Sequence, residues 1–186
     1  MQFKDVIGQS AVKQRLIQSV RENHVSHAQL FLGPAGSGKL PLALAYAQYI
    51  LCPNRTETDS CGVCPTCQKI QKLVHPDLHF VVPTNTTKSV KSNPESDLFM
   101  EEWREFTLKN DGYFNDTDWY AFLDIENKQG YMSVRDAASL LRKLNMKSYE
   151  GEYKIAIIWM AEKMRVETAN KLLKLLEEPP EKTVFL

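Results

Sequence analysis

A glycine-rich stretch near the start of the chain constrains the fold more than any other feature. Six largely apolar residues, 27–32, run into Gly33-Pro34-Ala35-Gly36-Ser37-Gly38-Lys39-Leu40. The spacing of Gly33 from Gly38-Lys39 is that of a phosphate-binding loop between a strand and a helix. Glycines let backbone N–H groups approach phosphate oxygens, and the positive end of the next helix faces the same anion. We therefore predict a strand over about residues 29–32 and a helix over about residues 39–51.

One position in this loop differs from what nucleotide hydrolysis requires. A Ser or Thr normally follows the lysine, and its hydroxyl binds magnesium. Here the residue is Leu40, which offers no oxygen. The glycines and Lys39 favour binding of ATP or ADP by residues 33–40, whereas the missing ligand opposes tight binding and makes Mg²⁺ a poor fit. We assign no catalytic residue.

A second motif follows the predicted helix. Cys52, Cys61, Cys64 and Cys67 are separated by eight, two and two residues. Four thiolates at this spacing can close a tetrahedral zinc site, and closed four-ligand sites are structural. An iron–sulfur cluster also uses Cys-x-x-Cys pairs, although its fourth ligand usually lies elsewhere, and free thiols are a third alternative. We predict a zinc knuckle over residues 52–67 that holds a structural Zn²⁺.

Composition limits the classes of function. A chain of 186 residues can bury one sizeable core. Its 23 Lys and Arg balance 23 Asp and Glu, so the formal net charge is zero. This disfavours a protein that binds nucleic acid alone through a basic surface. No apolar run approaches the roughly 20 residues of a membrane span, and no signal peptide opens the chain. We expect a soluble, cytoplasmic protein without a membrane partner.

The composition shifts between residues 84 and 130. Residues 84–93 are polar, and two aromatic-rich segments follow on either side of an Asn110-Asp111-Gly112 turn. Phe99, Trp103 and Phe106 recur at helical spacing in the first segment. We predict a helical insertion over residues 84–130 on the main core. Its aromatic rings could stack on bases or meet a partner protein, but their spacing favours packing against the chain itself.

The last third of the chain predicts a buried strand, a helix over about residues 166–178 and a final strand that begins near residue 183. Residues 153–158, Tyr-Lys-Ile-Ala-Ile-Ile, read as a buried parallel strand. In a P-loop ATPase such a strand ends in an acidic residue that positions magnesium, and AAA+ ATPases add a Glu that activates water. Trp159 and Met160 stand at these two places. Glu162 is expected to lie too far along the chain to substitute. Because the sequence ends within a predicted strand, we expect a fragment.

Four stretches together resemble the AAA+ domain of bacterial clamp-loader subunits, namely the gamma/tau and delta-prime subunits of DNA polymerase III. They are residues 3–9, residues 27–39, the cysteine cluster and residues 153–186, which include a Lys-Leu-Leu-Lys-Leu-Leu-Glu-Glu-Pro-Pro run at 171–180. The resemblance implies a three-layer α/β P-loop core with a parallel sheet over residues 1–186, ending before the family's lid and collar. It also implies that residues 3–9 lie near the adenine.

The resemblance further implies partners and a role in replication. Such rings use ATP to place the sliding clamp on primed DNA, so the implied partners are the gamma/tau and delta subunits, with clamp and DNA met only in the assembled complex. Residues 40, 159 and 160 are similar to the delta-prime type, a rigid scaffold that does not hydrolyse ATP.

Three alternatives explain the residues less well. An ATP-hydrolysing gamma/tau-type subunit predicts Ser or Thr at position 40 and carboxylates at positions 159 and 160. A small-molecule kinase with a P-loop also needs a magnesium ligand, and it leaves the cysteines unexplained. A free-standing zinc module that binds DNA is disfavoured by the zero net charge. We therefore expect a non-hydrolysing subunit of the DNA polymerase III holoenzyme.

Overall fold

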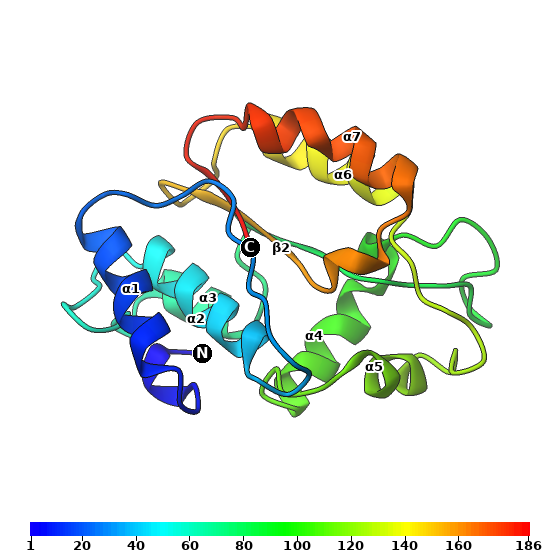
Figure 1. The fold of residues 1–186 in the computed structure, drawn as a ribbon, viewed down its shortest axis with the longest axis horizontal. Coiled ribbons are helices and arrows are strands. Elements are labelled where there is room, and N and C mark those ends of the chain that lie inside the picture. Colours follow the sequence, from blue (N-terminus) through cyan, green and yellow to red (C-terminus); the bar gives the residue numbers. More distant parts are fainter.

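Three short parallel strands lie at the centre of the computed structural model, which describes residues 1–186 (Figure 1). They are β1 (Leu78–Val81), β2 (Lys154–Ile158) and β3 (Thr183–Phe185), in the order β1-β2-β3. The register pairs Phe80 with Ile157 across β1 and β2, and Ala156 with Phe185 across β2 and β3. Nearly every strand residue is buried, which is why these segments are largely apolar rather than alternating, with only His79, Lys154 and Thr183 as exceptions.

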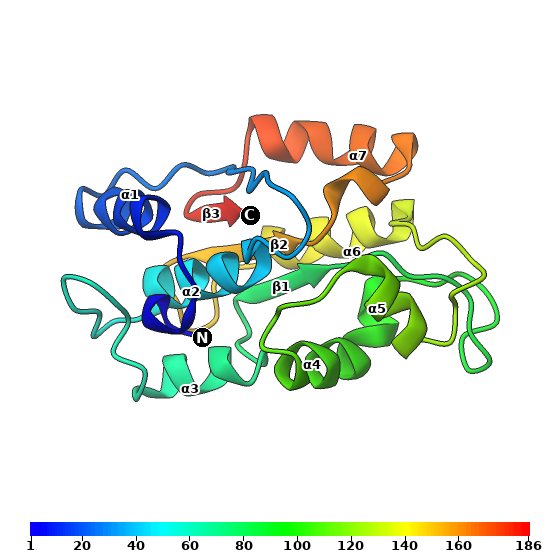
Figure 2. The ribbon, with the colours of Figure 1, turned by 60° about the horizontal axis from the view of Figure 1, so that its bottom comes forward.

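Helices cover both faces of this sheet, so the predicted α/β class with a parallel sheet is confirmed (Figure 2). On one face α6 (Val134–Asn145) and α7 (Val166–Glu177) lie side by side. The opposite side carries α1 (Ser10–Arg21), α2 (Lys39–Leu51), α3 (Pro65–Gln71), α4 (Met100–Lys109) and α5 (Asp116–Phe122). No helix combines the length and the apolar character needed to cross a membrane.

Strand residues alternate between two buried clusters. Val81, Ala156 and Phe185 pack with α6 and α7. Their neighbours Phe80, Ile155 and Val184 join the larger cluster that contains α2 and the aromatic side chains of α4 and α5. This alternation follows from the two-residue period of a strand. The sheet therefore separates a small core from a larger one that extends to the phosphate loop.

Helix α2 is the central helix of the larger core. Its bounds match the predicted range of 39–51, and every residue from Leu40 to Leu51 is buried. A helix that is apolar on all sides belongs inside a protein. The helix begins directly after Gly38, whose φ of +78° lies in the left-handed region that glycine adopts without strain.

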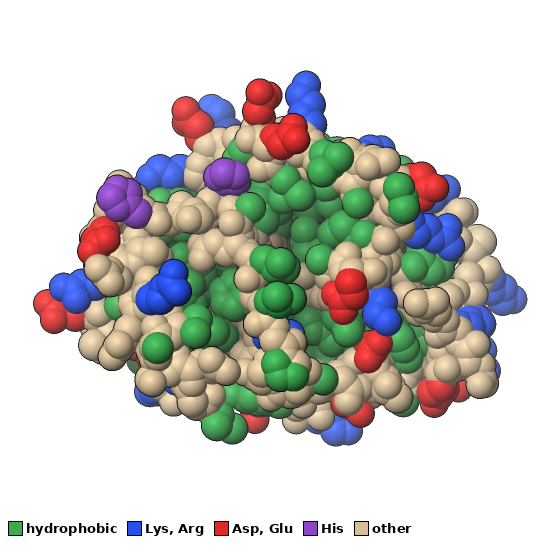
Figure 3. Space-filling model, in the orientation of Figure 1, with side chains coloured by type: hydrophobic (Ala, Val, Ile, Leu, Met, Phe, Trp, Pro, Cys, Tyr) green, Lys and Arg blue, Asp and Glu red, His purple; other side chains and the backbone are tan.

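The predicted strand over residues 29–32 is wrong. The structure has only an isolated bridge there, between Ala28 and Phe185, in which Gln29 N–H donates to Phe185 O at 2.9 Å. Leu30 and Leu32 are 79% and 88% exposed. In Figure 3 hydrophobic side chains gather over the middle of this face, with charged side chains of both signs mostly around them.

Candidate metal centre and phosphate loop

The four cysteine sulfurs meet at one point. Cys52 Sγ lies 3.6 Å from Cys61 Sγ and 3.9 Å from Cys64 Sγ, and Cys61 Sγ lies 3.9 Å from Cys67 Sγ. All four fall within 4.8 Å of one another, and none forms a disulfide. A tetrahedron with metal–sulfur bonds of about 2.3 Å has edges of about 3.8 Å. The spacing therefore fits one tetrahedral metal ion held by four thiolates.

Local backbone structure aims the sulfurs at this point. Cys52 caps the end of α2, and Cys64 caps the start of α3 and accepts a hydrogen bond from Cys67 N–H at 3.4 Å. Cys61 and Cys64 donate their N–H groups to the preceding ligand sulfurs, also at 3.4 Å. Gly62 makes the turn with a φ of +75°. A Cβ there would lie 2.7 Å from the Gln2 side chain, so only glycine fits without movement.

The thiols differ in how easily they ionise. Backbone N–H groups of Val63 and Cys64 lower the pKa of the Cys61 thiol to about 6. Burial raises the pKa of the Cys52 and Cys67 thiols, because a thiolate loses its hydration there. A cation between the four sulfurs would reverse that penalty. The donor set thus suits a soft or borderline metal ion and leaves no position open for a substrate.

The loop between the first two cysteines also fixes the N-terminal turn. The Asp59 carboxylate accepts the N–H groups of Phe3 and Lys4, both at 3.0 Å. Gln2 Nε2 donates to Ser60 O at 2.6 Å, and Ser60 Oγ accepts from the buried Gln48 side chain of α2 at 2.8 Å. The knuckle therefore connects α2 to the first residues of the chain.

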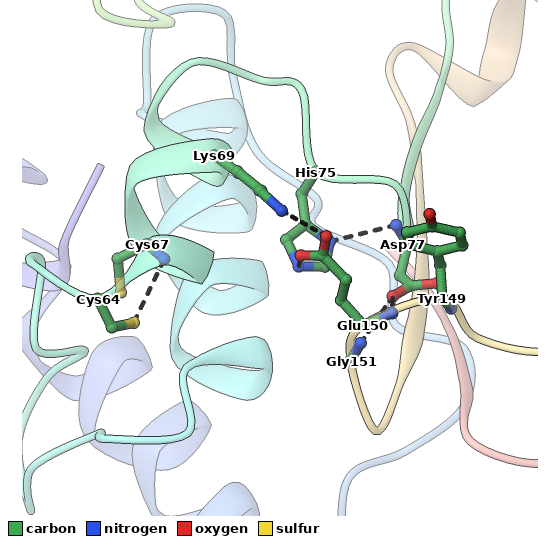
Figure 4. Close-up of polar contacts among 8 residues, drawn as sticks. All are labelled: Cys64, Cys67, Lys69, His75, Asp77, Tyr149, Glu150 and Gly151. Atoms are coloured by element: carbon green, nitrogen blue, oxygen red, sulfur yellow. Dashed lines mark hydrogen bonds and ion pairs between the residues drawn. The ribbon is translucent and has the colours of Figure 1, made fainter.

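A carboxylate that the sequence did not single out anchors the chain after α3 (Figure 4). Asp77 accepts three backbone N–H groups, from Tyr149 at 2.6 Å, Glu150 at 2.8 Å and Gly151 at 2.7 Å. Glu150 turns back to pair with Lys69 of α3, and it lies 3.9 Å from the buried His75. These contacts join α3 to the turn before β2. No motif or periodicity in the sequence marks this role of Asp77.

At the other end of α2 the phosphate loop bonds to itself. Lys39 Nζ donates to Gly33 O at 2.8 Å, to Pro34 O at 2.6 Å and to Ser37 Oγ at 3.4 Å. Gly36 and Gly38 have φ values of +75° and +78°, which open the backbone toward the loop's concave side. The residues predicted from the motif are thus contiguous in space, and the lysine is folded back over them.

A cavity of about 530 Å³ lies against this loop. Its lining includes all eight residues from Gly33 to Pro41 other than Pro34, together with Trp159, Met160 and Glu162. Leu40, Trp159 and Met160, the three positions that lack oxygens, therefore line the same cavity. Two carboxylates also line the cavity. Asp116 is paired with Lys163 at 3.0 Å, and Glu162 follows Met160 in an exposed turn.

Trp159 and Leu40 are parts of the hydrophobic core. The Trp159 ring lies 5.3 Å from Trp103 and 5.2 Å from Phe114, centroid to centroid. Trp103, in turn, packs edge-on against Trp119 at 5.3 Å. Leu40 is 5% exposed. The side chains at these positions therefore stabilise the fold and offer no donor atom to a cation.

Comparison with known proteins gives the family. A family model described as DNA polymerase III, delta subunit, matches residues 8–186. The chain belongs to this family. Among curated relatives, the delta-prime subunit of Pseudomonas aeruginosa is 30% identical over 161 residues, which is 87% of this chain and 36% of the relative. The delta-prime subunit of Bacillus subtilis is 29% identical over 176 residues, which is 95% of this chain and 40% of the relative.

The clamp-loader resemblance is confirmed, and both subunit types occur among the relatives. The tau/gamma subunit of Haemophilus influenzae is 26% identical over 184 residues, which is 99% of this chain and 20% of the relative. The chain therefore spans about a fifth to two fifths of the length of these relatives. Relatives of both subunit types match at similar identity, so identity does not separate delta-prime from tau/gamma.

Proposed function

We propose that this chain is the non-hydrolysing, delta-prime-type subunit of a DNA polymerase III clamp loader. Its role is to brace the complex that loads the sliding clamp onto primed DNA. The observation that carries the proposal is the lining of the cavity at the phosphate loop, where Leu40, Trp159 and Met160 present carbon and sulfur to the space beside Lys39. Hydrolysis needs oxygen ligands for magnesium and a base for water at such a place.

The proposal also includes a domain organisation. Residues 1–186 form an AAA+ nucleotide-binding-type domain, residues 52–67 a zinc knuckle and residues 84–130 a helical insertion. Four buried or half-buried sulfurs within 4.8 Å support a structural Zn²⁺ at Cys52, Cys61, Cys64 and Cys67. Residues 33–40 are the proposed nucleotide-binding residues, for ATP or ADP without bound Mg²⁺. The proposed partners are gamma/tau and delta subunits.

Reconstitution of the complex tests this proposal. In a clamp loader assembled from full-length subunits, Lys39→Ala in this chain is expected to leave DNA-stimulated ATP hydrolysis and clamp loading within about twofold of the unmodified complex, because no turnover depends on a site without magnesium ligands. The equivalent lysine change in a gamma/tau subunit of the same complex is the matched control and should abolish activity. A comparable loss from Lys39→Ala would assign this chain to the hydrolysing gamma/tau type instead.

A further inference from the structure

A turn from the 84–130 segment reaches across to the phosphate loop. After α4, Gly112 N–H donates to Thr107 O at 2.9 Å and Tyr113 N–H donates to Asn110 O at 2.8 Å. Gly112 is buried with a φ of +72°, and a Cβ there would lie 3.2 Å from Pro41 Cγ in the first turn of α2. Glycine is needed at this position because both the conformation and the space exclude a side chain. The turn is thus seated directly on the start of α2.

From this turn the Tyr113 side chain contacts both the phosphate loop and the N-terminal segment at Ile7. Its Cε1 atom would lie 3.4 Å from a Cβ built on Gly38, so the ring covers the backbone of the last glycine before Lys39. Its hydroxyl accepts the N–H of Ile7 at 2.8 Å. The side chain therefore closes the space between the phosphate loop and the N-terminal segment.

Cavities lie on both sides of this ring. The cavity of about 530 Å³ contains the phosphate loop, and a second one of about 420 Å³ is lined by Met1, Ile7, Leu44, Leu73 and other residues. Tyr113 and Gly112 line both. The second cavity has a mixed lining of apolar and polar residues, among them the buried hydroxyl of Thr107, which has no hydrogen-bond partner. A cavity with apolar walls and some polar groups can accept a flat heterocyclic ligand.

We propose that Tyr113 is a built-in plug, which holds the place that the base and ribose of a nucleotide would occupy when its phosphates bind at residues 36–39. The proposal rests on the proposed phosphate-binding role of that loop. A nucleotide must extend beyond the loop, and in the direction of Ile7 the tyrosine already fills the space and uses the available N–H donor. Lys39 is likewise satisfied by its own loop. The Ile7 N–H and the Lys39 ammonium are therefore both already bonded within the protein.

The plug is held by its neighbour in sequence. The ring of Phe114 lies 4.7 Å from Phe106 and 5.6 Å from Trp103, within the aromatic cluster that includes Trp159. Tyr113 itself is only half-buried. Removal of its ring should therefore open the space while Phe114 keeps the turn in place.

Binding of ADP to the full-length protein tests the plug. The apparent affinity of a site is reduced by the fraction of molecules in which it is open, so Tyr113→Ala should bind ADP at least about tenfold more tightly than the unmodified protein. Tyr113→Phe, which keeps the ring, should change ADP affinity by less than about threefold. Tripolyphosphate, which has no base, should bind all three proteins alike. Lys39→Ala in the Tyr113→Ala background should remove the gained affinity.

Several outcomes would overturn the plug. One is equal ADP affinity, or no ADP binding, for Tyr113→Ala and the unmodified protein. Another is a parallel gain in tripolyphosphate affinity, which would mean that the tyrosine acts on the loop and not on the base.

A measurement independent of binding is amide exchange at Ile7, which Tyr113→Phe should accelerate by about tenfold because the N–H loses its acceptor. Unchanged exchange would refute the contact. Magnesium-dependent hydrolysis by Tyr113→Ala would contradict the proposed function while supporting the plug.

Discussion

Helix α2 carries one motif at each end, and the two ends differ in what they retain. At its C-terminal end the knuckle has four sulfurs converging within 4.8 Å. At its N-terminal end the phosphate loop keeps its glycine conformations and Lys39, but the cavity beside it is lined by Leu40, Trp159 and Met160. The backbone conformation of a binding loop can therefore be present without the ligand atoms that its usual chemistry needs. The loop keeps its shape through its own hydrogen bonds from Lys39 to Gly33 O and Pro34 O, although Leu40, Trp159 and Met160 offer no oxygen beside it.

Loss of one knuckle ligand should have the largest effect. Cys67 is fully buried, and Cys67→Ser is expected to reduce bound zinc from about one ion per chain to almost none. Binding free energy of a structural metal is part of folding free energy, so unfolding should become easier by several kcal/mol. Metal analysis and urea unfolding measure both effects.

Val63→Ala is the matched control for this change, since Val63 lies in the same turn, is 73% exposed and donates no metal ligand. It should leave zinc content and the urea midpoint almost unchanged. Full zinc content in Cys67→Ser would contradict the four-thiolate site. A brown protein with visible absorption would indicate an iron–sulfur cluster instead.

A substitution beside the N-terminal end of α2 should destabilise the fold without creating ATPase activity. Trp159→Asp places a carboxylate where an ATPase would have one, yet it removes a ring from contact with Trp103 and Phe114. We expect a loss of about 3 kcal/mol in the free energy of unfolding, as for other large-to-small core changes. Trp159→Phe should lose less than half of that. An undiminished urea midpoint would show that the aromatic ring is not structural. Magnesium-dependent hydrolysis gained by this single change would show that one carboxylate is enough to restore activity.

Loss of the Asp77 carboxylate, which joins α3 to the turn before β2, should lower the free energy of unfolding by a smaller amount that depends on pH. Burial raises the pKa of Asp77, but three backbone N–H groups outweigh burial and the net pKa lies below the usual 3.8. A depressed carboxylate pKa stabilises the fold above the unfolded-state value, and this contribution is lost as pH falls through the folded-state value. Asp77→Asn should therefore cost about 1–2 kcal/mol at pH 7 and progressively less below about pH 4.

Urea unfolding at pH 7 and pH 3 measures this difference. Asp124→Asn is the control, because Asp124 is an exposed carboxylate paired with Lys88 on the surface and should contribute little at either pH. A cost of Asp77→Asn that stays the same at both pH values would show that the lost hydrogen-bond geometry, and not the charge, stabilises the turn.

The sequence predicted the elements whose signals are local. Helix α2 and the knuckle spacing could be read directly. A Ser-x-x-Asp pattern is also typical of a helix start, and in α6 Asp136 accepts the Ser133 N–H at 2.7 Å. A serine at the start of a helix is often its N-cap, but Ser10 is the first residue of α1, and Gln9 precedes it with a φ of +57°. Periodicity fixes where a helix lies better than which residue begins it.

What the sequence could not predict depends on distant partners. The expected strand at 29–32 has the composition of a strand, but this segment pairs with β3 only through the isolated bridge at Ala28. The contacts of Asp77 with residues 149–151 and of Tyr113 with Ile7 join segments 72 or more residues apart. No periodicity or motif marks such contacts, because they arise only when the core brings the segments together.

The most direct test of the account is ATP turnover by the isolated full-length protein, with and without magnesium. The account predicts that hydrolysis stays at the background of a Lys39→Ala control under both conditions, and that Leu40→Thr alone does not raise it, because no carboxylate is present at positions 159 and 160. Hydrolysis that requires magnesium and disappears in Lys39→Ala would contradict it.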